Sequence, residues 1–350
     1  MSRKQVWKVI GLSLLVCCLP LSSAQGVTFV SFDIPGSAYI QPQAINPSGV
    51  ITGWWQDASF SIHHGFVRAL DGTITTIDLG SDTQPQAISP SGTIVGFYTD
   101  QFGTHAFVRA PNTKITTLDF GNGSYTLAYG INPAGAVTGF YLSSSKYHGF
   151  ILRPGFSLPT IVDVPFQDST NTATAAYAIN PAGAITGFYN STYGQKGFLR
   201  TSGGSFTDFL PATGSVATLA TQPLSINPAR AITGYYVDVN GSNHGFIRTP
   251  GGTLTTIDGL NLPPAPSTTQ ALAINPAGTI VGYYFDAGFT SHGFILPPGG
   301  TFTTLDVPGS PNNPVLGTAA RAINPTGQIT GYYFDANGYH GFLRIPSGEE

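Results

Sequence analysis

The sequence predicts an all-β fold: a seven-bladed β-propeller of four-stranded antiparallel blades. A motif that reads Ala-Ile-Asn-Pro-x-Gly, then Ile-Thr-Gly-Tyr-Tyr, then His-Gly-Phe recurs with variations through the chain. Its isoleucines are spaced by 43 to 49 residues, a period typical of propeller-like arrays with several short strands per unit. The two ends of the chain also carry complementary parts of one repeat. The motif isoleucines are Ile45, Ile88, Ile131, Ile179, Ile226, Ile274 and Ile323.

Residues 1–24 are predicted to be a signal peptide. A basic start and an apolar run from Val9 to Leu21 precede the small residues Ser22–Ala24, which predicts cleavage before Gln25. The apolar run is too short to span a bilayer as a helix. We therefore expect a secreted protein, extracellular or periplasmic, whose residues 25–350 form a single domain without a membrane span.

Composition limits the chemistry of the mature chain. Cys17 and Cys18 are the only cysteines and are lost on cleavage, which excludes disulfides, thiol nucleophiles and cysteine-ligated metals. Charged residues make up 9% of the chain and the net charge is −3. No basic stripe for nucleic acid is evident, so we expect no nucleic-acid partner, no cofactor and a monomer.

The last repeat shows the expected order of elements. The first strand ends at Asn-Pro-x-Gly, a sequence that favours a turn, and the second is rich in Ile, Thr and Tyr, which favour strands. Asn-Gly then predicts a tight hairpin before the third strand. The expected strands are Thr318–Asn324, Gln328–Phe334 and His340–Ile345.

The fourth strand of this last repeat is missing from the C-terminus. The sixth repeat has it as Thr301–Ser310, and nearly the same sequence stands near the N-terminus as Thr28–Ser37. We therefore expect the N-terminal strand to complete the last blade. Closure of this kind removes two open sheet edges.

Each repeat carries two adjacent aromatic residues after a glycine. Adjacent strand residues point to opposite faces, so each blade is expected to offer one ring to each neighbouring blade. The favoured interpretation is a core between blades, and sugar stacking is the alternative. The glycine is expected to let blades approach closely. The pairs begin at Trp54, Phe97, Phe140, Phe188, Tyr235, Tyr283 and Tyr332.

Histidine and aspartate recur in step with the strands. One histidine position is filled in six repeats, and Lys196 replaces it in the fourth. One aspartate series follows the aromatic pair and another ends the fourth strand. One series is expected to orient the histidines and the other to cap turns, which leaves no metal site. The histidines are His64, His105, His148, His244, His292 and His340.

The ordered motif set resembles the bacterial extracellular HAF repeat family. The resemblance rests on Ala-Ile-Asn-x-x-Gly, the Gly-aromatic pair and a His-Ala/Gly-Phe triplet such as His105-Ala106-Phe107, and it covers residues 28–348. It implies an exported bacterial protein and supplies no catalytic residues.

Few acids remain for catalysis. Glycosidases need two convergent carboxylates, and no serine elbow, phosphate loop or metalloprotease motif is present. We therefore expect a non-enzymatic binding or scaffold protein for a glycan or an extracellular protein. The alternative is a polysaccharide-degrading lyase or glycosidase that uses Asp82, Asp168 or Asp208.

The symmetry breaks on the first strand of each repeat, two residues before the isoleucine. Amides, tyrosines and an arginine around a channel suit a neutral polar ligand, although they could equally solvate the channel entrance. We expect these side chains near the mouth formed by the loops that lead into the first and third strands. The predicted ligand-binding residues are Gln43, Gln86, Tyr129, Tyr177 and Arg321.

Overall fold

A computed structural model describes residues 21–24, 26–121, 125–166, 169–211, 218–260, 267–309 and 315–347. These residues form an all-β protein, and no helix occurs within the ranges. Accordingly, the described chain has no helix with the length and apolarity needed to cross a membrane. The predicted all-β class is confirmed.

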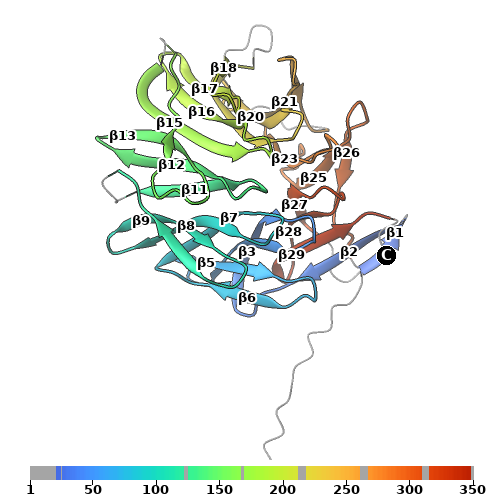
Figure 1. Ribbon diagram of the computed structural model, residues 1–350. Coiled ribbons are helices and arrows are strands. Elements are labelled where there is room, and N and C mark those ends of the chain that lie inside the picture. Colours follow the sequence, from blue (N-terminus) through green and yellow to red (C-terminus); the bar gives the residue numbers. More distant parts are fainter. Residues whose placement is uncertain are drawn as a thin grey trace, which may run out of the picture.

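The strands fall into antiparallel groups that follow the repeats, and Figure 1 shows these groups arranged in chain order around a common centre. The first group holds β3 (Ser37–Ile45), β4 (Ile51–Asp57), β5 (His63–Arg68) and β6 (Ile74–Ile77); the second β7 (Asp82–Ile88), β8 (Ile94–Asp100), β9 (Gly103–Arg109) and β10 (Ile115–Leu118); the third β11 (Thr126–Ile131), β12 (Val137–Ser143), β13 (Lys146–Leu152) and β14 (Thr160–Ile161); the fourth β15 (Ser169–Ile179), β16 (Ile185–Ser191), β17 (Gly194–Arg200) and β18 (Phe206–Phe209). The fifth group holds β19 (Thr218–Ile226), β20 (Ile232–Asp238), β21 (Asn243–Arg248) and β22 (Leu254–Ile257); the sixth β23 (Thr269–Ile274), β24 (Ile280–Phe285), β25 (Ser291–Leu296) and β26 (Thr303–Leu305); the last β27 (Gly317–Ile323), β28 (Ile329–Asp335) and β29 (Gly338–Ile345).

The last group is completed from the N-terminus, as predicted. β2 (Val27–Phe32) pairs antiparallel with β29, from Thr28 opposite Ile345 to Phe32 opposite Gly341. β1 (Leu21–Ala24) adds an outer strand against β2, so cleavage after Ala24 would leave the pairing of β2 with β29 in place.

Phenylalanine and threonine explain the interior of each group. The phenylalanine of every His-Gly/Ala-Phe triplet, and of Lys196-Gly-Phe in the fourth repeat, is fully buried. Several of these residues accept through their carbonyl oxygen a hydrogen bond from the threonine of Ile-Thr-Gly, as in Thr52 to Phe66 at 2.7 Å. A threonine hydroxyl that bonds to backbone can be buried without an unsatisfied polar group. The buried phenylalanines are Phe66, Phe107, Phe150, Phe198, Phe246, Phe294 and Phe342.

The two aromatics of each pair have different environments, which corrects the expectation that both fill the core between blades. The second ring lies against the histidine, with centroids 5.0 Å apart for Tyr236 and His244. This second ring is fully or almost fully buried in the later repeats, as at Tyr189 and Tyr236. The first ring stays half-buried and contacts residues of the first strands, as Phe140 contacts Tyr129.

The glycine before the pair serves a close approach within a group, not between blades as expected. A Cβ at Gly53 would collide with the carbonyl oxygen of Gln41 on the neighbouring strand. The first strand is irregular opposite this glycine, because the register shifts between Pro42 and Ala44. The glycine therefore accommodates a β-bulge.

Neighbouring groups touch through their first strands. Contacts join β3 to β7, β7 to β11, β11 to β15, β15 to β19, β19 to β23, β23 to β27 and β27 back to β3. Single parallel pairs, such as Tyr147 with Ala173 and Gln195 with Ala220, link some groups into a longer sheet.

A buried polar residue ends each first strand and ties the groups together. In Asn180 the side-chain oxygen accepts a hydrogen bond from the amide of Ala184 at 2.9 Å, and Nδ2 donates to the carbonyl of Asn227 in the next repeat at 3.1 Å. In the last repeat, Nδ2 of Asn324 donates to the carbonyl of Asn46 in the first at 3.1 Å. The residues at this position, here called the asparagine ring, are Asn46, Ser89, Asn132, Asn180, Asn227, Asn275 and Asn324.

The second repeat supplies a natural control for this ring. Ser89 accepts from the amide of Thr93 through its hydroxyl at 3.0 Å, but it has no side-chain amide with which to donate to the next repeat.

We predict that Asn180→Ala lowers the free energy of unfolding by about 1–3 kcal/mol, because it leaves a buried backbone amide unsatisfied. Asn180→Ser should lower it less. Urea unfolding of both variants checks this, and equal losses would contradict the assigned roles of the two amide atoms.

Candidate functional site

The predicted ligand residues occupy one structural position, the unpaired residue of a β-bulge. In every first strand the pairing register skips the residue two before the motif isoleucine. A bulge redirects a side chain without ending the strand. The residues at this position, here called the bulge ring, are Gln43, Gln86, Tyr129, Tyr177, Leu224, Leu272 and Arg321.

Members of the bulge ring contact each other across group boundaries. Arg321 donates from its guanidinium to Oε1 of Gln43 at 2.7 Å, and Gln43 donates to Oε1 of Gln86 at 3.4 Å. The rings of Tyr129 and Tyr177 lie 4.6 Å apart. The structure therefore brings the five predicted residues into two contacting sets, and their role in ligand binding stays a prediction.

The strand register places the bulge ring nearer to the C-terminal ends of the first strands than we expected. We call the side of the molecule with the Asn-Pro-x-Gly turns the turn face, and the side where second strands lead into third strands the hairpin face. Gln43 precedes the turn residue Asn46 by three positions, whereas the strand begins at Ser37 on the hairpin side. The ring thus lies nearer the turn face, not at the hairpin-face loops where we expected it.

Burial raises the pKa of the tyrosines of this region further above their usual value. It raises the pKa of Tyr177 to about 12, with a further contribution from Tyr235, and raises the pKa of Tyr129 above its usual value. Burial also raises the pKa of Tyr283 to about 12, against the opposing charge of Arg321. Arg321 is therefore the charged member of an otherwise neutral bulge ring.

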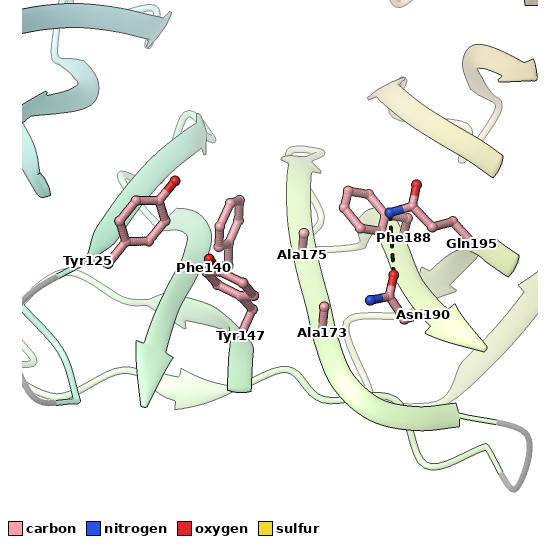
Figure 2. A pocket seen from close by; sticks show the side chains of 8 residues that line it. All are labelled: Tyr125, Phe140, Tyr147, Ala173, Ala175, Phe188, Asn190 and Gln195. Atoms are coloured by element: carbon pink, nitrogen blue, oxygen red, sulfur yellow. Dashed lines mark hydrogen bonds between the residues drawn. The ribbon is translucent and has the colours of Figure 1, made fainter. Parts of the chain in front are cut away.

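A pocket opens between the third and fourth groups on the hairpin face. It has a volume of about 290 Å³, close to the lower limit of about 300 Å³ for small-molecule sites. Figure 2 shows Tyr125, Phe140 and Tyr147 on one side of β15, with Phe188, Asn190 and Gln195 on the other. The lining residues are Tyr125, Phe140, Tyr147, Ala173, Ala175, Phe188, Asn190 and Gln195.

Two amides are fixed at the pocket wall. Gln195 donates to Oδ1 of Asn190 at 3.3 Å and accepts from Gln222 at 2.7 Å. Aromatic walls with a few fixed amide groups suit a neutral ring that carries hydroxyl groups.

Two small residues, Ala173 and Ala175 of β15, lie between the aromatic wall and the amide wall of the pocket. Where a third strand begins, it meets the start of the next first strand, and each repeat fills this junction differently. Tyr339 packs on Tyr39 at 4.6 Å, whereas Tyr147 faces Ala173. The residue before the histidine differs from repeat to repeat, and this variation is the sequence signal for the site, which was not predicted. The junction residues on third strands are His63, Thr104, Tyr147, Gln195, Asn243, Ser291 and Tyr339.

The repeated histidines are held by aspartates, as expected. Nδ1 of His105 lies 2.7 Å from the fourth-strand Asp119, and Nε2 lies 3.1 Å from Asp100 after the aromatic pair. Asp100 also accepts from the amide of Phe102, so this series both caps the hairpin and contacts the histidine.

Asp208 also belongs to this repeated series, although the sequence predicted it as an acid outside the series that was available for catalysis. It lies 3.4 Å from Nζ of Lys196, which stands in place of the histidine, and accepts from the hydroxyl of Tyr189 at 3.1 Å. Asp168 lies outside the described residues.

One acid–base pair lies outside the repeat series. Nδ1 of His63 is 2.8 Å from Asp82 on the hairpin face, at the junction between the first and second groups. Gln84 lies beside both side chains, and Trp54 packs edge-on against the His63 ring. Within the described ranges, no cluster of three or more His, Cys, Asp or Glu side chains could hold a metal ion.

The His340–Asp33 pair joins the segment after β2 to the last group of strands. The hydrogen bond that Nδ1 of His340 donates to Asp33, at 2.6 Å, raises the pKa of His340 above 6.5, and burial opposes this shift. The raised pKa of His340 stabilises the fold below pH 6.5, and this stability is lost as pH rises through the folded-state pKa.

We predict that the melting temperature falls less between pH 6 and pH 8 in His340→Gln than in the wild type. Equal slopes in melting curves would contradict the coupling.

Comparisons with known proteins identify the fold. No family model matches the chain, and no curated protein does. Among solved structures, streptogramin B lyase aligns with a TM-score of 0.57 at 12% identity, over 91% of this chain and 97% of the other. Virginiamycin B lyase from Staphylococcus aureus gives 0.56 at 14% identity, over 91% and 99%. A prolyl endopeptidase gives 0.59 at 12% identity, over 95% of this chain and 54% of the other. At these identities the likeness concerns the fold alone, and the chain is an all-β protein with propeller-type structural neighbours.

Proposed function

We propose that this chain is a secreted, non-enzymatic β-propeller that binds a neutral glycan on its hairpin face. The observation that carries the proposal is the pocket beside β15, which combines aromatic walls with the paired amides of Asn190 and Gln195. The rings of Tyr129 and Tyr177 lie against the pocket residues Phe140 and Phe188 and extend this uncharged lining.

The proposed architecture has seven blades closed into a ring, with residues 25–350 as one domain. The pairing of β2 with β29, the contact of β27 with β3 and the hydrogen bond from Asn324 to Asn46 all support closure. The motif order supports membership of the extracellular HAF repeat family, and the basic-apolar leader supports export.

A second candidate function is cleavage of a polysaccharide. The His63–Asp82 pair favours it, because a histidine oriented by a carboxylate can act as a general base. In this case His63→Ala should abolish product release from a polysaccharide without changing the fold.

We predict that Ala173→Leu and Tyr147→Ala each weaken glycan binding about threefold to tenfold. The first variant fills the pocket, and the second removes an aromatic wall whose stacking contributes about 0.5–1.5 kcal/mol. A glycan array with the wild-type protein should identify a neutral ligand, and calorimetry with that ligand should give the affinities.

Tyr193→Ala is the matched control, because Tyr193 is an exposed tyrosine, 75% accessible, that does not line the pocket. The double variant Arg321→Ala, Tyr177→Ala tests the bulge ring separately. If both pocket variants keep the wild-type affinity, the glycan does not bind in this pocket. If the wild type releases products from a polysaccharide and His63→Ala does not, the enzymatic function is favoured instead.

A further inference from the structure

Charge is segregated between the two faces of the molecule. The third strand of a group ends at the turn face, because it runs in the same direction as the first strand. Arginines stand at these ends, and the turns add Lys114 and Arg230. The arginines at or next to the ends of third strands are Arg68, Arg109, Arg153, Arg200, Arg248 and Arg344.

Most described carboxylates lie at the opposite side. Aspartates follow the second and fourth strands or open a first strand, and these positions belong to the hairpin face. Of the acids in the described ranges, Asp71 is the one placed in a turn of the turn face, beside Arg68. The hairpin-face aspartates are Asp33, Asp57, Asp78, Asp82, Asp100, Asp119, Asp163, Asp208, Asp238, Asp258, Asp286, Asp306 and Asp335.

Arg230 occupies a position that the backbone reserves for glycine. The fourth residue of the Asn-Pro-x-Gly turn is left-handed in every repeat, and Arg230 has φ 70° there. Its amide donates to the carbonyl of Asn227 as the glycines do to their own asparagines. A left-handed conformation is unfavourable for a residue with a Cβ, so the fold gains nothing locally from this arginine. The other repeats have Gly49, Gly92, Gly135, Gly183, Gly278 and Gly327.

Arg230 belongs to an arc of neighbouring cations. Burial lowers the pKa of Arg248, and the nearby charge of Arg230 lowers it further. Burial and then the charge of Arg153 lower the pKa of Arg200 in the same way. The charge of Arg230 therefore acts on Arg248 and that of Arg153 on Arg200, and an anion bound at Arg230 or Arg153 would be attracted by both charges of each pair.

A groove extends the arc toward the second group. It has a volume of about 510 Å³, and Arg153 lines it together with the hydroxyl-bearing residues Ser91, Thr93 and Thr116. Guanidinium groups bind carboxylates in a bidentate manner, and hydroxyls can bond to the sugar hydroxyls between them. Cations spread over several repeats of one face match the spaced charges of a linear polymer.

We propose that the turn face binds an acidic polysaccharide, one that carries uronate carboxylates, through Arg153, Arg200 and Arg230, with the buried Arg248 adding its charge behind Arg230. This site lies on the face opposite the neutral pocket and is independent of the proposed function. The acidic hairpin face would repel the same polymer, which fixes the orientation of binding.

The test uses the purified mature protein and polygalacturonate, with its methyl ester as the uncharged control. The wild type should bind polygalacturonate at 50 mM salt, lose affinity at least tenfold by 500 mM salt, and ignore the ester. Arg230→Gly should lower affinity at least threefold while its melting temperature stays equal or rises, since glycine suits the turn. Arg153→Gln combined with Arg230→Gly should lower affinity at least tenfold.

Lys146→Gln is the matched control, because it removes one positive charge near the hairpin face. Its affinity for polygalacturonate should equal that of the wild type. The proposal is overturned by no binding of the wild type, by equal affinity in the arginine variants, or by an equal loss in Lys146→Gln. Stronger binding to duplex DNA or to phosphatidylserine vesicles than to polygalacturonate would also overturn it.

Discussion

The buried polar residue at the end of each first strand is the constraint on which the architecture depends. Each asparagine must satisfy an oxygen and an amide away from water, because an unsatisfied buried polar group is costly. The oxygen is used within the repeat, and the observed amide bonds reach the following repeat, including the bond from Asn324 to Asn46. One residue type therefore forms the turn and sets the spacing between repeats.

The bulge and its facing glycine explain how a symmetric scaffold carries different side chains. The glycine allows the backbone of the first strand to approach, and the bulge removes one residue from the pairing. That residue is free of the ladder, so it varies from Gln43 to Leu224 to Arg321 without changing the strands. The junction residues, which precede the histidine where each third strand begins, vary for a similar reason. At the end of a strand a side chain is less constrained by its neighbours in the sheet.

Much of the fold could be predicted from the sequence, because every repeat carries the same pattern of turn and strand residues. The completion of the last group by the N-terminal strand followed from matching Thr28–Ser37 to Thr301–Ser310. The asparagine ring was missed, because a turn signal does not show where the side-chain amide points.

The site was predicted less well, and the reasons are geometric. Symmetry breaking correctly identified the bulge ring as a set of neighbours, but its depth depends on strand register. The pocket at Tyr147 and Ala173 was missed, because its two sides come from different repeats. The positions of the arginines could be read from the sequence. That they lie on one face could be deduced only once the directions of the third strands were known.

The central claim is that the repeats form one closed unit held by bonds between first strands. Residues 25–350 contain two tryptophans, Trp54 and Trp55, both in β4, so the fluorescence of a protein with this span reports on the first repeat alone. Urea unfolding followed by this fluorescence and by far-ultraviolet circular dichroism tests the claim most directly. A closed ring predicts that the two transitions coincide. A fluorescence transition at clearly lower urea than the dichroism transition would show that the first repeat unfolds alone, as in an open array, and would contradict the account.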